Sequence, residues 1–120
     1  MAELEHAARA DDVLRDALAR GANVHVVTGS MVFTQEELLK AIARVMDFPD
    51  YFGGNLDALY DYLTDLSWLP RGAHVLLWTG PNMLAVTEPS GYESVRDVLA
   101  AAVDRMRDGQ RTLSVILTDS

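Results

Sequence analysis

The chain has 120 residues, of which 49% are hydrophobic, enough to form one globular domain with a buried core. Its net charge of −8 argues against nucleic acid or an anionic membrane as a direct ligand and favours a basic partner. The lack of cysteine excludes disulfides and thiolate chemistry. The first residues have neither the basic end nor the apolar run of a signal peptide, and no apolar stretch has membrane-spanning length, so we expect a cytoplasmic protein.

The N-terminal residues 1–22 are predicted to form an extension with one short helix, which Asp11 or Asp12 would cap. Capping-box patterns that start at Thr34 and at Ser90 predict two further helices. Three apolar segments have the character of strands and are separated by helical stretches. These predicted strands are residues 23–28, 73–79 and 113–118. The alternation predicts an α/β fold with a small three-stranded parallel sheet.

A helix-sized segment between Gly53 and Leu66 carries an unusual charge pattern, and Asn55 is a good N-cap for it. At 100° per residue, one arc of the helix is apolar and the opposite arc is polar. The apolar arc holds Leu56, Leu59, Tyr62, Leu63 and Leu66, and the polar arc holds Asp57, Tyr60, Asp61, Thr64 and Asp65.

The three aspartates of this segment are spaced i, i+4, i+8, so that neighbouring carboxylates repel each other by a few tenths of a kcal/mol. No Lys, Arg or His lies between Arg44 and Arg71 to relieve that repulsion. An ordinary solvated face is one interpretation, but such faces normally interleave bases with acids. Tyr60 in the same arc and Tyr51 just before the helix favour a protein-binding surface for a cationic partner.

The residue types needed for catalysis or metal binding are sparse. His25 and His74 lie inside predicted strands, where a histidine is normally a core or sheet-surface residue, and His6 has no neighbour at ligand spacing. The sequence contains no nucleophile elbow and no phosphate-binding Gly-rich loop. Asp57 and Asp61 leave a metal-dependent phosphohydrolase as an alternative. We expect no enzyme, no metal, no cofactor and no small-molecule substrate.

The run from Phe48 to Thr64 closely resembles the central motif of the barstar family of intracellular ribonuclease inhibitors. The resemblance extends from about Val24 to Thr118 and includes the strand with Trp78. That family has a three-stranded parallel sheet packed with helices. The resemblance therefore implies a barstar-like domain over residues 23–120, preceded by the helical extension at residues 1–22.

The resemblance also implies a function, which is to bind a secreted microbial guanyl-specific ribonuclease one-to-one and to occlude its basic active-site cleft. Asp61 would occupy the phosphate pocket, Asp57 would pair with further basic groups, and Tyr51 would pack against the catalytic histidine. An immunity protein for a different basic nuclease toxin is the alternative. The residues expected to contact the partner are Tyr51, Gly53, Asn55, Asp57, Ala58, Tyr60, Asp61, Thr64, Asp65 and Trp68.

One departure from the family pattern concerns a second acidic patch, which the resemblance implies on the last long helix. Ala101 and, approximately, Arg105 stand at those positions here. The patch would therefore be lost or shifted to Asp104 or Asp108.

Overall fold

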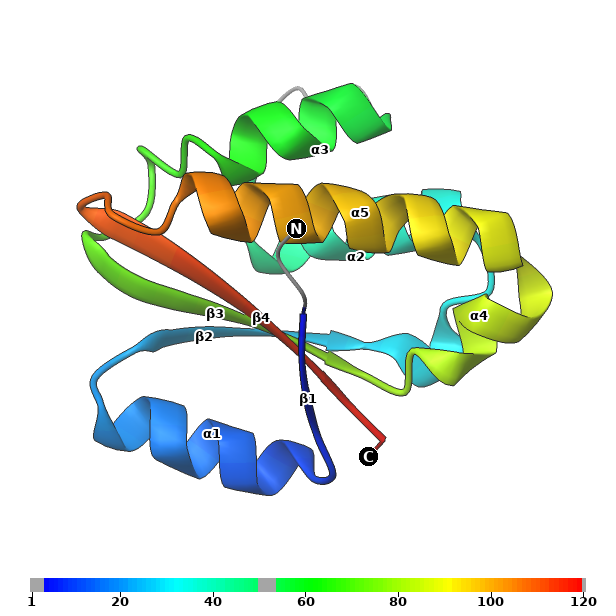
Figure 1. Ribbon diagram of the computed structural model, residues 1–120, viewed down its shortest axis with the longest axis horizontal. Coiled ribbons are helices and arrows are strands. Elements are labelled where there is room, and N and C mark those ends of the chain that lie inside the picture. Colours follow the sequence, from blue (N-terminus) through cyan, green and yellow to red (C-terminus); the bar gives the residue numbers. More distant parts are fainter. Residues whose placement is uncertain (1–3, 50–53, 120) are drawn as a thin grey trace.

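The computed structural model describes residues 4–49 and 54–119, and its centre is a four-stranded sheet. All of its strand pairs are parallel, and the spatial order is β1-β4-β3-β2. The strands are β1 (Glu5–Ala7), β2 (Asn23–Thr28), β3 (Gly72–Thr79) and β4 (Arg111–Thr118), as Figure 1 shows. The parallel α/β architecture was predicted, but the expected number of three strands was wrong. The fourth strand, β1, has only 3 residues, too few for an alternating pattern to reveal it.

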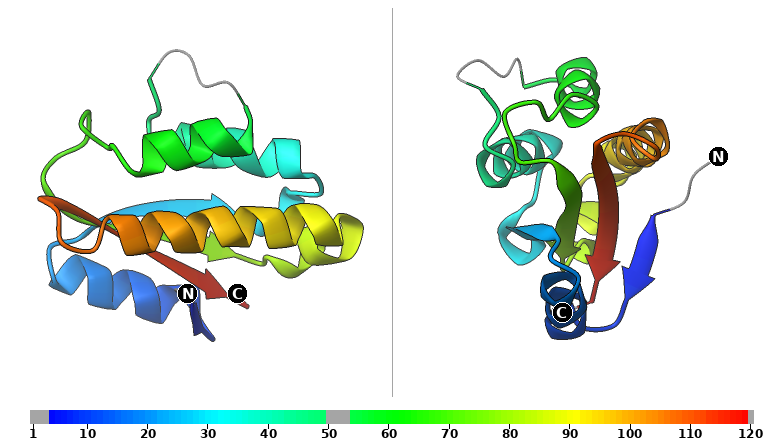
Figure 2. Two further views of the ribbon diagram at one scale, coloured as in Figure 1. Left: turned by 45° about the horizontal axis from the view of Figure 1, so that its top comes forward. Right: turned by 90° about the vertical axis from the view of Figure 1, so that its left-hand side faces the viewer.

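Helices cover both faces of the sheet (Figure 1). The helix α1 (Ala10–Ala19) packs on one face, whereas α2 (Gln35–Val45) and α5 (Pro89–Arg105) pack on the other. Figure 2 shows α3 (Leu56–Leu63) farther from the sheet than α2 and α5, and α3 contacts α5. A single 3₁₀ turn, η1 (Gly29–Met31), and the short helix α4 (Asn82–Thr87) pack together after the ends of β2 and β3.

The segment before β2 completes one edge of the sheet and covers one face. β1 pairs with β4, with Glu5 opposite Ile116 and Ala7 opposite Thr118. Ala17 of α1 is fully buried in a small apolar cluster on that face. The residue that caps α1 is Arg9, so the expected cap at Asp11 or Asp12 was wrong. Both aspartates lie instead in the first turn, where the positive end of the helix dipole favours acids.

The main core fills the space between the opposite face of the sheet and α2, α3 and α5. Each large aliphatic side chain buried there stabilises the fold by about 1.5–3 kcal/mol. The fully buried members include Leu38, Leu39 and Ile42 of α2, Leu59 and Leu63 of α3, Leu76 and Trp78 of β3, and Leu99 of α5.

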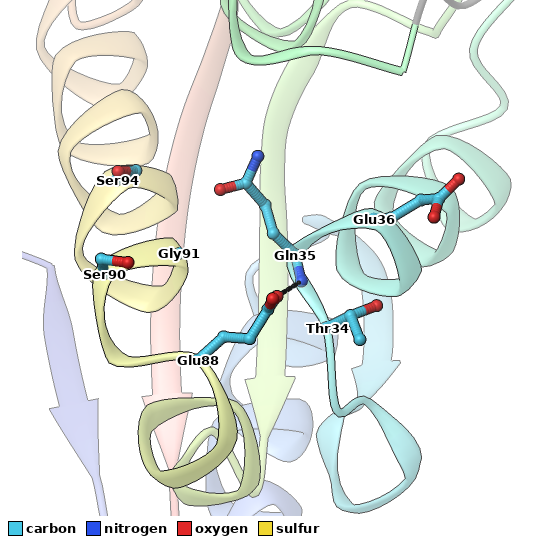
Figure 3. Close-up of a pocket in the computed structure, with 7 residues that line it drawn as sticks. All are labelled: Thr34, Gln35, Glu36, Glu88, Ser90, Gly91 and Ser94. Atoms are coloured by element: carbon cyan, nitrogen blue, oxygen red, sulfur yellow. Dashed lines mark hydrogen bonds between the residues drawn. The ribbon is translucent and has the colours of Figure 1, made fainter.

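The starts of α2 and α5 lie side by side and are joined by one carboxylate (Figure 3). The predicted capping box of Thr34 with Glu37 is confirmed at the start of α2. The box predicted at Ser90 was wrong, because α5 already begins at Pro89, directly after Glu88. Proline suits this first turn, where its missing N–H has no partner to lose. Glu88 accepts a hydrogen bond of 2.6 Å from the Gln35 backbone N–H, which ties the two helices together.

Gly29 lies where η1 approaches β3 closely. A Cβ atom added there would meet the Thr79 carbonyl oxygen, and would lie 2.7 Å from Trp78 Nε1 and 2.9 Å from the Gly80 oxygen. We predict that Gly29→Ala lowers the free energy of unfolding by about 2 kcal/mol because two of these neighbours are backbone atoms. Denaturant titration would measure the loss, with Ser30→Ala at the neighbouring exposed position as the control. Equal stabilities of the two variants would contradict this account.

Candidate functional site

The helix α3 is fixed at both ends by local hydrogen bonds. Asn55 is the N-cap, as predicted, and its Oδ1 accepts a hydrogen bond of 2.8 Å from the Ala58 N–H. Gly54 before it has a φ of +69°, a conformation that glycine adopts without strain. At the other end, the Thr64 hydroxyl donates to the Tyr60 carbonyl at 2.8 Å. These contacts define a helix of 8 residues with a fixed orientation at its start.

The inner face of α3 is anchored in the core. Leu59 and Leu63 have no exposed surface, and Leu66 beyond the helix is equally buried. Leu66 adopts a φ of +53°, which a non-glycine residue rarely does, and its burial holds the chain in this turn. The burial of these leucines decides which side of α3 faces solvent.

The outer face of α3 presents two carboxylates without bases. Asp57 and Asp61 are exposed and one helical turn apart, and neither carboxylate has a hydrogen-bond or ion-pair partner among residues 4–49 and 54–119. Elsewhere, five exposed acids do pair with a base, namely Asp11, Asp12, Asp16, Glu36 and Asp104. The charge on α3 is therefore available to an external cation.

The expected third carboxylate, Asp65, is not part of the helical stripe. α3 ends at Leu63, and Asp65 lies in the turn that leads to Leu66. Its side chain accepts a hydrogen bond of 3.2 Å from the Ser67 hydroxyl. The prediction that Asp65 continues the acidic face of the helix was wrong, because the helix ends at Leu63 and the chain turns at the buried Leu66.

A shallow pocket of about 470 Å³ lies where α3 meets α5. Tyr60 was predicted on the polar arc, but it is half-buried and packs against the main core while it lines this pocket. The pocket therefore combines an aromatic wall with an acidic rim. Its lining is Leu56, Asp57, Tyr60 and Asp61 from α3, and Asp97, Val98 and Ala101 from α5.

Asp97 is a candidate site residue that the sequence reasoning missed. It is exposed and lies one helical turn before Ala101, the position at which the second acidic patch was sought. Asp104 pairs with Arg107 at 2.9 Å, and Asp108 follows the end of α5. The sequence signal was that Asp97 lies four residues before Ala101, on the same side of α5. This spacing alone does not tell which side of α5 faces α3.

Other expected contact residues have structural partners or lie outside the described residues. Trp68 donates from Nε1 to the Met46 carbonyl at 2.9 Å, and its ring packs edge-on against Phe48 and Tyr62. This cluster joins the chain before α3 to the chain after it. Tyr51 and Gly53 belong to residues 50–53, which are outside the described ranges.

The described ranges contain no group of three or more His, Cys, Asp or Glu side chains arranged to hold a metal ion. Within these ranges, no helix combines the length and the apolar character needed to cross a bilayer.

Comparison with known proteins identifies the family of this chain. The family model described as Barstar (barnase inhibitor) matches residues 22–118. None of the curated proteins matches the chain. The family match covers most of the 120 residues and includes β2, β3, β4 and every helix except α1. The chain therefore belongs to the barstar (barnase inhibitor) family.

Proposed function

We propose that this protein inhibits a secreted microbial guanyl-specific ribonuclease by inserting the outer face of α3 into the active-site cleft of the enzyme. Membership of the barstar family implies a barnase-type ribonuclease inhibitor or a related immunity protein. The observation that carries the narrower proposal is the pair Asp57 and Asp61, which is exposed and one turn apart and forms no ion pair within the described part of the chain. We further propose that it acts in the cytoplasm and forms a one-to-one complex.

The chemistry of a ribonuclease cleft suits such a surface. The enzyme gathers positive charge to stabilise the phosphate that becomes more negative during cleavage. Two carboxylates on a rigid helix can take the place of phosphate oxygens there, and little conformational freedom is lost because the capped, anchored helix is already ordered. In this proposal Asp61 occupies the phosphate pocket and Asp57 pairs with neighbouring bases. The opposite charges of the two surfaces also accelerate association.

The residues around the two carboxylates complete the proposed contact surface. Tyr60 and Asp97 supply the aromatic wall and the acidic rim of the adjoining pocket. Asn55 and Thr64 cap α3, and Ala58 lies within it. The proposed flanking contacts are Tyr51, Gly53, Asp65 and Trp68.

A second candidate is an immunity protein for a different basic nuclease toxin. The position of Asp97 favours it, because the acidic residue on α5 lies one turn before the site that the family resemblance implies. A partner whose basic groups are arranged differently would fit such a displacement.

We predict that Asp61→Asn weakens binding to the ribonuclease at least about 30-fold, since it removes a charged hydrogen-bond acceptor from the interface. The free energy of unfolding should stay within about 0.5 kcal/mol or rise, because the repulsion from Asp57 is relieved. Calorimetric titration and thermal unfolding would measure the two effects. Asp16→Asn is the matched control, an equal charge change on an α1 residue already paired with Arg20. Similar affinities of the two variants would contradict the assignment.

We predict a smaller effect for Asp97→Asn, a loss of about three- to tenfold in affinity with unchanged stability, because an exposed charge at an interface rim contributes modestly. Asp11→Asn, an exposed acid of α1 on the opposite face of the sheet, provides the comparison. If the two variants bind alike, the pocket between α3 and α5 is not part of the interface.

A further inference from the structure

Two histidines on the neighbouring strands β2 and β3 form a continuous chain of contacts between the carbonyls of Val45 and Pro70. The Nδ1 atom of His25 lies 2.8 Å from the Val45 carbonyl oxygen. Its Nε2 lies 3.0 Å from Nδ1 of His74, and Nε2 of His74 lies 2.7 Å from the Pro70 carbonyl oxygen. His74 is only 1% exposed, and His25 is half-buried.

The number of protons needed by these contacts follows from the chemistry of imidazole. Both outer nitrogens face carbonyl oxygens, which only accept, so each outer nitrogen must carry a proton. The contact between the two inner nitrogens needs one further proton. Two neutral rings have only two protons between them, so one of the three contacts would then place two lone pairs against each other. Two fully protonated rings would place two N–H groups against each other at the centre. The three contacts are satisfied together only when the pair holds one proton beyond neutrality.

We propose that His25 and His74 share one extra proton and act as a proton-dependent clamp on the segment that carries α3. Val45 is the last residue of α2, and Pro70 lies two residues before β3. The excursion, meaning the segment 45–70 that contains α3, begins at Val45 and ends at Pro70, the two residues whose carbonyls the histidines contact. The histidine pair therefore fastens both ends of this excursion to the sheet.

The groups around the pair shift the pKa of His25 in opposite directions. Burial lowers the pKa of His25, and the charge of His74 lowers it further, whereas the hydrogen bond to Val45 and the charge of Asp47 raise it. The extra proton is therefore assigned to the pair as a whole, where the contact of 3.0 Å between the two inner nitrogens needs it. Arg111 of β4 donates to the Leu69 carbonyl at 2.9 Å, beside Pro70. Among the described residues, Arg44 and Arg71 are the charged side chains next to Val45 and Pro70 in the sequence, and both are exposed.

The sign of the pH dependence follows from proton counts. In the unfolded chain each ring has a pKa of about 6.5. The three contacts favour the singly protonated pair, so above this pH the folded pair holds more protons than the unfolded chain, and stability falls as the pH rises. Below it the unfolded chain binds two protons and the folded pair still one, so stability falls again. The contribution of the clamp is therefore greatest near about pH 6.5.

Imidazole ¹⁵N NMR of the whole protein between pH 5 and 9 would test the proposal without any partner. The chain has 3 histidines, and the exposed His6 is the internal reference. At a pH where His6 is neutral, we expect three protons on the four nitrogens of the pair, with Nδ1 of His25 protonated. Two protons on these four nitrogens at that pH would overturn the proposal.

Amide hydrogen exchange would test the clamp itself. After correction for intrinsic exchange rates, we expect protection of residues 56–66 to fall about tenfold more than protection of α1 as the pair loses its proton. His74→Gln should abolish this difference, and His6→Gln should preserve it. If His74→Gln does not fold, the unaltered protein still decides, because equal changes in α1 and α3 would contradict the clamp. Failure here would leave the proposed ribonuclease inhibition intact, since neither readout involves a partner.

Discussion

The burial of three leucines beneath α3 is the interaction on which the acidic surface depends. Leu59, Leu63 and Leu66 have no exposed surface, and each contributes about 1.5–3 kcal/mol through its burial. The repulsion between Asp57 and Asp61 on the opposite face amounts to a few tenths of a kcal/mol. Because burial outweighs repulsion by about an order of magnitude, the helix can carry unpaired charges without bases to balance them. The buried leucines beneath α3 therefore fix the position of its acidic outer face.

The short length of α3 makes its tertiary support necessary. A helix of 8 residues is too short to be stable alone, so its order comes from its caps and from packing. Asn55 fixes the start, and the Trp68 indole joins the chain after α3 to Met46 before it. His25 and His74 contact the same excursion at its two ends. The contacts of these residues at the ends of α3 therefore position the aspartates on its outer face.

Local patterns predicted the elements whose signals are local, and failed where distant residues decide. The strands 23–28 and 113–118, the Thr34 capping box and the Asn55 cap were predictable from neighbouring residues. The start of α5 was not, because its N-cap residue Glu88 makes no side-chain cap and its carboxylate accepts a hydrogen bond from Gln35 of α2. The role of Asp97 depends on how α5 lies against α3. The contact between the two histidines depends on the register of β2 and β3, in which His74 lies opposite Asn23 and diagonal to His25.

The central claim is that the acidic face of α3 occupies the active site of a ribonuclease, and competition with an active-site nucleotide tests it most directly. A guanyl-specific secreted ribonuclease would be titrated with this protein at increasing concentrations of guanosine 3′-monophosphate. The account predicts that the apparent Kd rises in proportion to the nucleotide concentration once the nucleotide is in excess of its own Kd. An apparent Kd that does not change with nucleotide would mean that the protein binds elsewhere on the enzyme and would contradict the account.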